Sequence, residues 1–290
     1  MSSTHQKCIL CNSSKLSPVK KYDSAHLTNC VACNFKFSSK IPTKEELIKH
    51  YEGYGRNDYL SPITVKRYNE ILDTFERFKQ TGNLLDVGCG IGYFLEEANK
   101  RGWTVYGTEF TSEAIKICKE KGFKIHEGIL NPKNYKQKFD IITSFEVIEH
   151  INNPQEELKN YHLILRDGGL FYCTTPNFNS ISRRILKEKW NVISYPEHLS
   201  YYTPRSLKNL LLNNNFNNIK IKTSGFSINT FKNSISSNYE EKISPLSSDE
   251  RLRIKMEKNK IYSALKSTIN FILSNLKLGD SIKVYAIKNN

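Results

Sequence analysis

The glycine-rich segment that begins at Asn83 constrains the fold of this chain more than any other feature. It reads Asn-Leu-Leu-Asp-Val-Gly-Cys-Gly-Ile-Gly-Tyr-Phe-Leu from Asn83 to Leu95. The apolar run Leu84–Val87 predicts a short strand, the alternate glycines predict a tight turn, and Phe94–Arg101 predicts a helix. A strand, a glycine turn and a helix in this order are typical of the nucleotide-binding half of a Rossmann fold.

The spacing of the glycines and the acid beside them indicate the charge of the ligand. Gly88, Gly90 and Gly92 follow the pattern G-x-G-x-G. A dinucleotide site favours G-x-G-x-x-G, with a pyrophosphate at the helix N-terminus. Asp86 precedes the first glycine, and its carboxylate would repel a pyrophosphate. A cationic ligand suits this turn better. S-adenosylmethionine (SAM) carries a sulfonium and an amino group, so we expect SAM rather than a nicotinamide cofactor.

The segments that follow predict a mostly parallel sheet with helices between its strands. The expected strands are Thr104–Glu109, Lys124–Glu127, Phe139–His150 and Leu170–Thr174. Ligands of such sheets bind at the carboxyl ends of the strands. Glu109 lies 17 residues after Gly92, near the distance of about 20 residues at which a carboxylate reaches ribose hydroxyls.

Four of the seven cysteines form two close pairs near the N-terminus. Cys8-x2-Cys11 is followed by 18 residues and then by Cys30-x2-Cys33, a spacing typical of a four-thiolate zinc ribbon. Such a closed site has no open coordination position, so we expect structural zinc. Free cysteines or disulfides are the alternatives. The N-terminus has no long apolar core and the chain no run of about 18 apolar residues, so we expect a cytoplasmic protein with reduced thiols.

The chain is strongly basic, with 43 Lys and Arg residues against 29 Asp and Glu residues and a net charge of +14. Such a charge attracts nucleic acid, a phosphorylated substrate or an anionic membrane. A peripheral contact of the protein with an anionic membrane is therefore one expectation. The excess is spread along the chain rather than gathered in an Arg and aromatic patch, which disfavours nucleic acid.

Four regions are expected from these signals. A zinc-ribbon module spans residues 1–40, and a helical linker spans 41–80, with a tyrosine-rich loop at 51–59 as a candidate lid. A Rossmann-like catalytic domain covers 81–227. Residues 228–290 are expected to supply a helical cap on the acceptor side and an antiparallel closing strand within 279–288.

Taken together, the motifs resemble those of class I SAM-dependent methyltransferases, in particular the subgroup similar to the ubiquinone-biosynthesis O-methyltransferase. The matching segments are L-L-D-V-G-C-G-x-G, G-x-E, F-D-x-I-x-x-x-x-V-x-E-H, G-G-L and T-P-N, followed by Trp190 and the Pro-Glu-His-Leu segment. The resemblance covers residues 84–226. A start with two cysteine pairs is similar to that of many bacterial sugar and polysaccharide-cluster methyltransferases.

The resemblance implies a role for each matching position. The SAM-binding set would be Asp86, Gly88, Gly90, Gly92, Glu109, Phe110, Phe145 and Glu146. His150 and His198 would be the candidate bases. Tyr201, Tyr202 and Arg183 would contact the acceptor, while Cys8, Cys11, Cys30 and Cys33 would bind zinc.

The function expected from this resemblance is O-methylation of a saccharide or nucleotide-sugar in the synthesis of a bacterial surface glycan. C-methylation of a nucleotide-linked deoxysugar is a close alternative, although those enzymes usually carry a further C-terminal domain for which this chain is too short. A zinc-ribbon protein that binds or modifies RNA is the alternative from another class.

Overall fold

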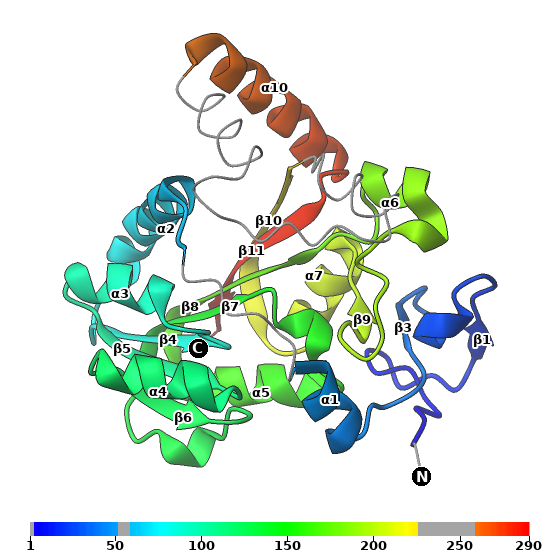
Figure 1. Ribbon diagram of the computed structural model, residues 1–290, viewed down its shortest axis with the longest axis horizontal. Helices are drawn as coiled ribbons and strands as arrows, with labels where there is room; N and C mark the ends of the chain where they lie inside the picture. The colour runs from blue at the N-terminus through cyan, green and yellow to red at the C-terminus, as the bar shows by residue number, and fades with distance from the viewer. Residues whose placement is uncertain (1–2, 52–58, 226–258, 290) are drawn as a thin grey trace.

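The computed structural model describes residues 3–51, 59–225 and 259–289, which form two sheets and the helices around them (Figure 1). The larger sheet has seven strands in the order β10-β11-β8-β7-β4-β5-β6. Its strands are β4 (Asn83–Val87), β5 (Thr104–Glu109), β6 (Lys124–Glu127), β7 (Phe139–Phe145), β8 (Leu165–Pro176), β10 (Phe216–Ser224) and β11 (Ser281–Lys288).

The direction of the strands confirms the expected Rossmann-like architecture. Strands β6, β5, β4, β7 and β8 pair in parallel with one another, so their carboxyl ends share one edge. Strand β11 runs antiparallel to both β8 and β10. The C-terminal segment therefore supplies an inner strand of the catalytic sheet.

Helices cover both faces of the sheet because the strands bury apolar side chains alternately on each side. One face packs against α2 (Pro62–Phe75) and α3 (Tyr93–Lys100), where Leu84 belongs to the same core cluster as Leu72 and Phe94. On the other face, Leu85 belongs to the cluster of α5 (Pro154–Ile164) and α7 (Pro204–Leu212). The remaining helices are α1 (Lys44–Tyr51), α4 (Ser112–Glu120), α6 (Ile181–Leu186) and α10 (Lys260–Leu276).

Helix α10 extends away from the edge of the sheet formed by β10 and β11 (Figure 1). In the described part of the chain, no helix has the length and apolar character that crossing a membrane requires. The candidate lid falls largely outside the described residues, as does the segment between residues 226 and 258.

Local sequence explains where the linker helices begin. Thr43 and Glu46 form the reciprocal bonds of a capping box, in which Thr43 Oγ1 accepts from Glu46 N at 3.2 Å and Glu46 Oε2 accepts from Thr43 N at 2.9 Å. Ser61 Oγ accepts from Ile63 N at the start of α2, and Pro62 occupies the first helical position.

The smaller sheet joins the N-terminal module (residues 3–40) to the catalytic chain. Its strands are β1 (Leu16–Pro18), β2 (Leu27–Cys30), β3 (Lys36–Ser38) and β9 (Ser200–Tyr201). Strand β9 comes from the segment after α6 and pairs antiparallel with β3. Phe35 and Phe37 are buried in the same core cluster as Tyr202. The module therefore folds onto the catalytic domain.

Two expected boundaries were wrong. Strand β7 ends at Phe145 rather than at residue 150, because Glu146 takes a positive φ of 52° and a 3-10 turn follows at Ile148–His150. Strand β8 begins at Leu165, five residues before the expected start, since α5 ends at Ile164.

Candidate functional site

The turn after β4 requires glycine at two positions. Gly88 has a φ of +70°, and a Cβ there would lie 2.6 Å from Val147 Cγ2. Gly92 has a φ of +84°, and its Cβ would lie 2.9 Å from Cys118 Sγ. Both the backbone conformation and the close approach exclude a side chain. Gly90 also has a positive φ of 53° but faces open space.

Glu109, at the end of β5, fixes the shape of this turn. Its Oε2 accepts a hydrogen bond from Gly90 N at 2.9 Å. Its Oε1 accepts from Phe110 N at 2.7 Å and from Thr111 N at 2.9 Å. Phe110 follows with 67% of its side chain exposed, so its ring is available to a ligand at this edge.

Asp86 lies at the end of β4, beneath the turn, and is buried. Thr143 Oγ1 donates to Asp86 Oδ1 at 2.7 Å. Burial, together with the negative charge of Glu109, raises the pKa of Asp86 to about 7. The carboxyl is therefore poised to ionise when a positive charge arrives. The site brings Asp86, the three glycines and Glu109 together.

The ends of β7 and β8 form the second part of the site. The Phe145 ring packs on Phe94 and Tyr68. The backbone N–H of Glu146 donates to Thr174 O at 3.1 Å, which ties the left-handed turn to β8. The Glu146 side chain keeps access to solvent but is surrounded by protein on most sides, and this desolvation raises its pKa.

His150 and His198 come together although 47 residues separate them in the sequence. Their ring centroids lie 4.8 Å apart. The Nδ1 of His150 lies 2.7 Å from Glu197 O, and the Nδ1 of His198 lies 2.7 Å from Val192 O. A carbonyl oxygen can only accept, so each Nδ1 carries a proton. Burial lowers the pKa of His150 to about 4, so its ring is neutral at pH 7.

Glu149 completes this cluster and was missed in the sequence. Its carboxylate and the two histidines offer ligand atoms within 4.8 Å of one another, a donor set that suits a divalent metal ion. Thr175 Oγ1 donates to Glu149 Oε2 at 2.9 Å. Burial and the nearby Glu146 charge raise the pKa of Glu149. The available signal was the short spacing of two acids, Glu146 and Glu149, directly before His150.

Lys283 on β11 was also missed. It lies opposite Thr174 in the register of β8 and β11. Burial and the positive charge of Arg67 lower the pKa of Lys283. Nothing in its local sequence distinguishes Lys283 from the other lysines of the chain. Only the antiparallel register of β8 and β11 brings it near Glu146.

A small void beside Glu149 and His198, too narrow to hold a water molecule, is lined by Glu149, Pro176, Phe178, Trp190, Val192, His198, Ser200 and Tyr201. Tyr201 is buried and donates from its hydroxyl to His198 O at 3.1 Å. Tyr202 is fully buried against Phe35 and is not among the residues that line the void. The Arg183 guanidinium lies over the Phe178 ring, 4.0 Å from its centroid.

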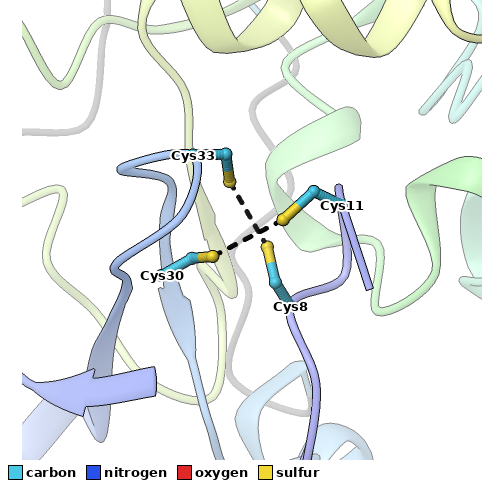
Figure 2. Close-up of side chains that lie close together, drawn as sticks. All are labelled: Cys8, Cys11, Cys30 and Cys33. Carbon is cyan, nitrogen blue, oxygen red and sulfur yellow. Dashed lines mark hydrogen bonds between the residues drawn. The ribbon is translucent and has the colours of Figure 1, made fainter. Parts of the chain in front are cut away.

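The four paired cysteines meet at one point of the N-terminal module (Figure 2). The sulfurs of Cys8 and Cys33 are 3.6 Å apart, those of Cys11 and Cys30 are 3.5 Å apart, and all four lie within 4.8 Å of one another. A tetrahedral zinc ion with Zn–S bonds of about 2.3 Å separates its sulfurs by about 3.8 Å. The cluster therefore fits zinc.

Comparison with curated proteins finds relatives that match part of the chain. The ubiquinone biosynthesis O-methyltransferase of Coxiella burnetii (strain Dugway 5J108-111) is 32% identical over 108 residues, which cover 33% of this chain and 44% of that protein. The enzyme of the same name from Pelagibacter ubique (strain HTCC1062) is 27% identical over 173 residues, or 54% of this chain and 72% of that protein. The chain thus spans less than half the length of the Coxiella protein that it matches.

Solved structures share the fold at low identity. A SAM dependent methyltransferase from Archaeoglobus fulgidus superposes with a TM-score of 0.53 at 20% identity, covering 83% of this chain and 99% of that one. Phosphoethanolamine N-methyltransferase 2 of Haemonchus contortus gives a TM-score of 0.53 at 18% identity, over 95% and 67% of the two chains. The family model described as "Methyltransferase domain" matches residues 63–221, more than half of the chain. The chain therefore belongs to the methyltransferase domain family.

Proposed function

We propose that this methyltransferase moves a methyl group from SAM to a hydroxyl group of a small acceptor, a saccharide or nucleotide-sugar. One observation carries the cofactor assignment: two carboxylates, Asp86 and Glu109, flank a glycine turn that leaves room for a ligand at the edge of the sheet. This arrangement suits a cationic nucleoside and opposes a pyrophosphate.

In this proposal the amino and sulfonium end of SAM binds near Asp86 and the glycine turn. Glu109 accepts from the ribose hydroxyls while it holds Gly90 N, and Phe110 packs on the adenine. Phe145 and Glu146 border the methyl group at the end of β7. The relatives and the fold support SAM as the cofactor. The roles of these residues are part of our proposal.

The reaction needs alignment and a base. The acceptor oxygen attacks the methyl carbon, the C–S bond breaks toward sulfur, and S-adenosylhomocysteine leaves. The hydroxyl proton passes to a histidine Nε2, for which His150 is the first candidate and His198 the second. A positioned base of this kind contributes about 10²–10⁴-fold to the rate, and the in-line geometry supplies most of the remainder.

Two acceptor classes have support. The four-cysteine N-terminus resembles that of bacterial sugar and polysaccharide-cluster methyltransferases, which favours a glycan precursor, with C-methylation of a nucleotide-linked sugar as its variant. The names of the curated relatives favour O-methylation of a ubiquinone precursor. In O-methylation, both classes offer a hydroxyl oxygen as the acceptor atom. We further propose that Cys8, Cys11, Cys30 and Cys33 bind a structural zinc ion.

Transfer of a labelled methyl group tests the proposal. The full chain is incubated with methyl-labelled SAM and with nucleotide-sugars, sugar phosphates, purified glycan or hydroxylated quinone precursors. We expect label in a saccharide acceptor and no transfer by the Asp86→Asn variant. Label in the quinone precursors alone would replace the glycan assignment. If titration calorimetry finds no association of the wild-type protein with SAM, the cofactor assignment is wrong.

A further inference from the structure

Two basic side chains, one from the N-terminal module and one from α6, meet at the Phe178 ring. Phe178, which follows β8, lines the void beside His198 and is buried. Two cations lie against its ring. The Arg183 guanidinium is 4.0 Å from the ring centroid, and the Lys36 ammonium, which comes from β3, is 5.8 Å from it.

Within residues 3–51, 59–225 and 259–289, neither Lys36 nor Arg183 forms an ion pair. The Lys36 ammonium is held instead by amide oxygens, at 3.1 Å from Asn29 Oδ1 and 3.0 Å from Asn34 Oδ1. Burial, and then the positive charge of Arg183, lower the pKa of Lys36. Two like charges brought together in a partly buried place are destabilising unless an anion joins them.

Two buried hydrogen-bond donors at the same place also have no acceptor in the described chain. The Nε of Arg183 is one of them. The other is the indole N–H of Trp190, whose side chain is 2% exposed and whose ring packs on Phe178 at 6.3 Å between centroids. Leaving a buried donor unpaired costs about 1–3 kcal/mol. Both donors therefore point to a ligand that supplies acceptor oxygens.

We propose that Lys36, Arg183 and Trp190 bind a phosphate group of the methyl acceptor. Trp190 and Phe178 line the same small void as His198, which places this site beside one of the candidate bases. Lys36 belongs to the N-terminal module and pairs in register with Tyr201 of β9. The module then contributes directly to substrate binding. This inference rests on the proposed function and narrows its substrate to a phosphate ester.

Equilibrium dialysis at low ionic strength tests this site. It measures the binding of inorganic phosphate and of glucose 1-phosphate to the full zinc-loaded chain. We expect Arg183→Gln to weaken both ligands at least about tenfold, and Lys36→Gln to weaken them several-fold. Arg183→Lys keeps the charge but loses the forked donors, and we expect an intermediate affinity. Unphosphorylated glucose is expected to bind no better to the wild type than to any variant.

Matched variants separate this site from general charge. Arg184→Gln removes the next charge on α6, where Arg184 is exposed and donates to Asn179 Oδ1, and Lys20→Gln removes an exposed charge of the same N-terminal module. We expect both to bind phosphate within twofold of the wild type. Equal losses in Arg183→Gln and Arg184→Gln, or no phosphate binding by a wild-type chain with its zinc, would overturn the inference.

The failure of this site and the failure of the proposed function can be distinguished. SAM affinity is measured by calorimetry in the same variants, and thermal unfolding shows that each is folded. We expect SAM affinity to remain within twofold in Arg183→Gln, since Arg183 does not belong to the glycine turn. If the wild-type protein does not bind SAM, the proposed function is wrong. The phosphate titrations still test the phosphate site in that case.

Discussion

Asp86 is a buried acid whose pKa lies near neutrality, so the charge of the site depends on its ligand. A SAM molecule bound beside it favours the ionised form, whereas burial favours the protonated form. When the pH lies below this pKa of about 7, Asp86 is protonated in the free protein. Binding of the cation must then release a proton from Asp86.

We expect the affinity for SAM to rise with pH and then level above about pH 7. Below that value it should fall by up to about tenfold per pH unit. Calorimetry between pH 5.5 and 8.5, in buffers of different ionisation enthalpy, measures both the affinity and the released proton. Asp86→Asn should bind SAM weakly with a flat pH profile. A wild type as flat as this variant would contradict the assignment.

His150 is expected to act on catalysis rather than on cofactor binding. Its neutral ring offers the Nε2 lone pair, so His150→Gln should lower kcat about 10²–10⁴-fold. Single-turnover transfer of labelled methyl measures the loss, and calorimetry with SAM should show little change. His198→Gln is the comparison. If His198→Gln lowers kcat and His150→Gln does not, His198 rather than His150 is the base.

At the scale of the elements, the glycine turn between β4 and α3 offers a matched pair of substitutions. Gly88→Ala combines a positive φ with a contact of 2.6 Å to Val147, whereas Gly90→Ala meets nothing within 4 Å and has the positive φ alone. We expect Gly88→Ala to weaken SAM at least about tenfold and Gly90→Ala to cost about 1 kcal/mol of stability. Calorimetry and thermal unfolding measure the two effects. Equal effects of the two changes on SAM affinity would show that the Val147 contact is unimportant.

The same elements explain what the sequence allowed us to predict. The strand, turn and helix at residues 83–101 were readable because apolar runs, glycines and Asp86 are local signals. The pairing of β9 with β3 was not readable, since a two-residue strand carries no periodicity. The partners of His198 and the position of Lys283 depend on contacts between distant segments. The end of β7 was misjudged because Glu146 adopts a left-handed conformation that few non-glycine residues take.

At the scale of the whole molecule, the N-terminal module and the catalytic domain share a sheet and a core cluster. A module of about 35 residues buries too little apolar surface to fold without a metal or a neighbour. Here β9 supplies the neighbour, and the cysteine cluster offers a site for the metal.

Removal of zinc is therefore expected to disturb the acceptor side more than the cofactor side. A chelator, or the Cys30→Ser variant, should lower the melting temperature and raise the KM for the acceptor, because β9 adjoins His198 and Trp190. The dissociation constant of SAM should change less than threefold. Metal analysis, thermal unfolding and steady-state kinetics check these outcomes. A loss confined to SAM binding would contradict the described coupling.

Strand β9 has one more consequence. Ser200 and Tyr201 complete the small sheet of the N-terminal module, which also carries the cysteine cluster. Any molecule that stabilises the segment around β9 therefore also stabilises the cysteine site. Thermodynamic coupling works equally in both directions. Binding of a molecule at the proposed acceptor site should then slow the loss of a bound zinc ion to a colorimetric chelator, so that the rate of zinc release reports on acceptor binding.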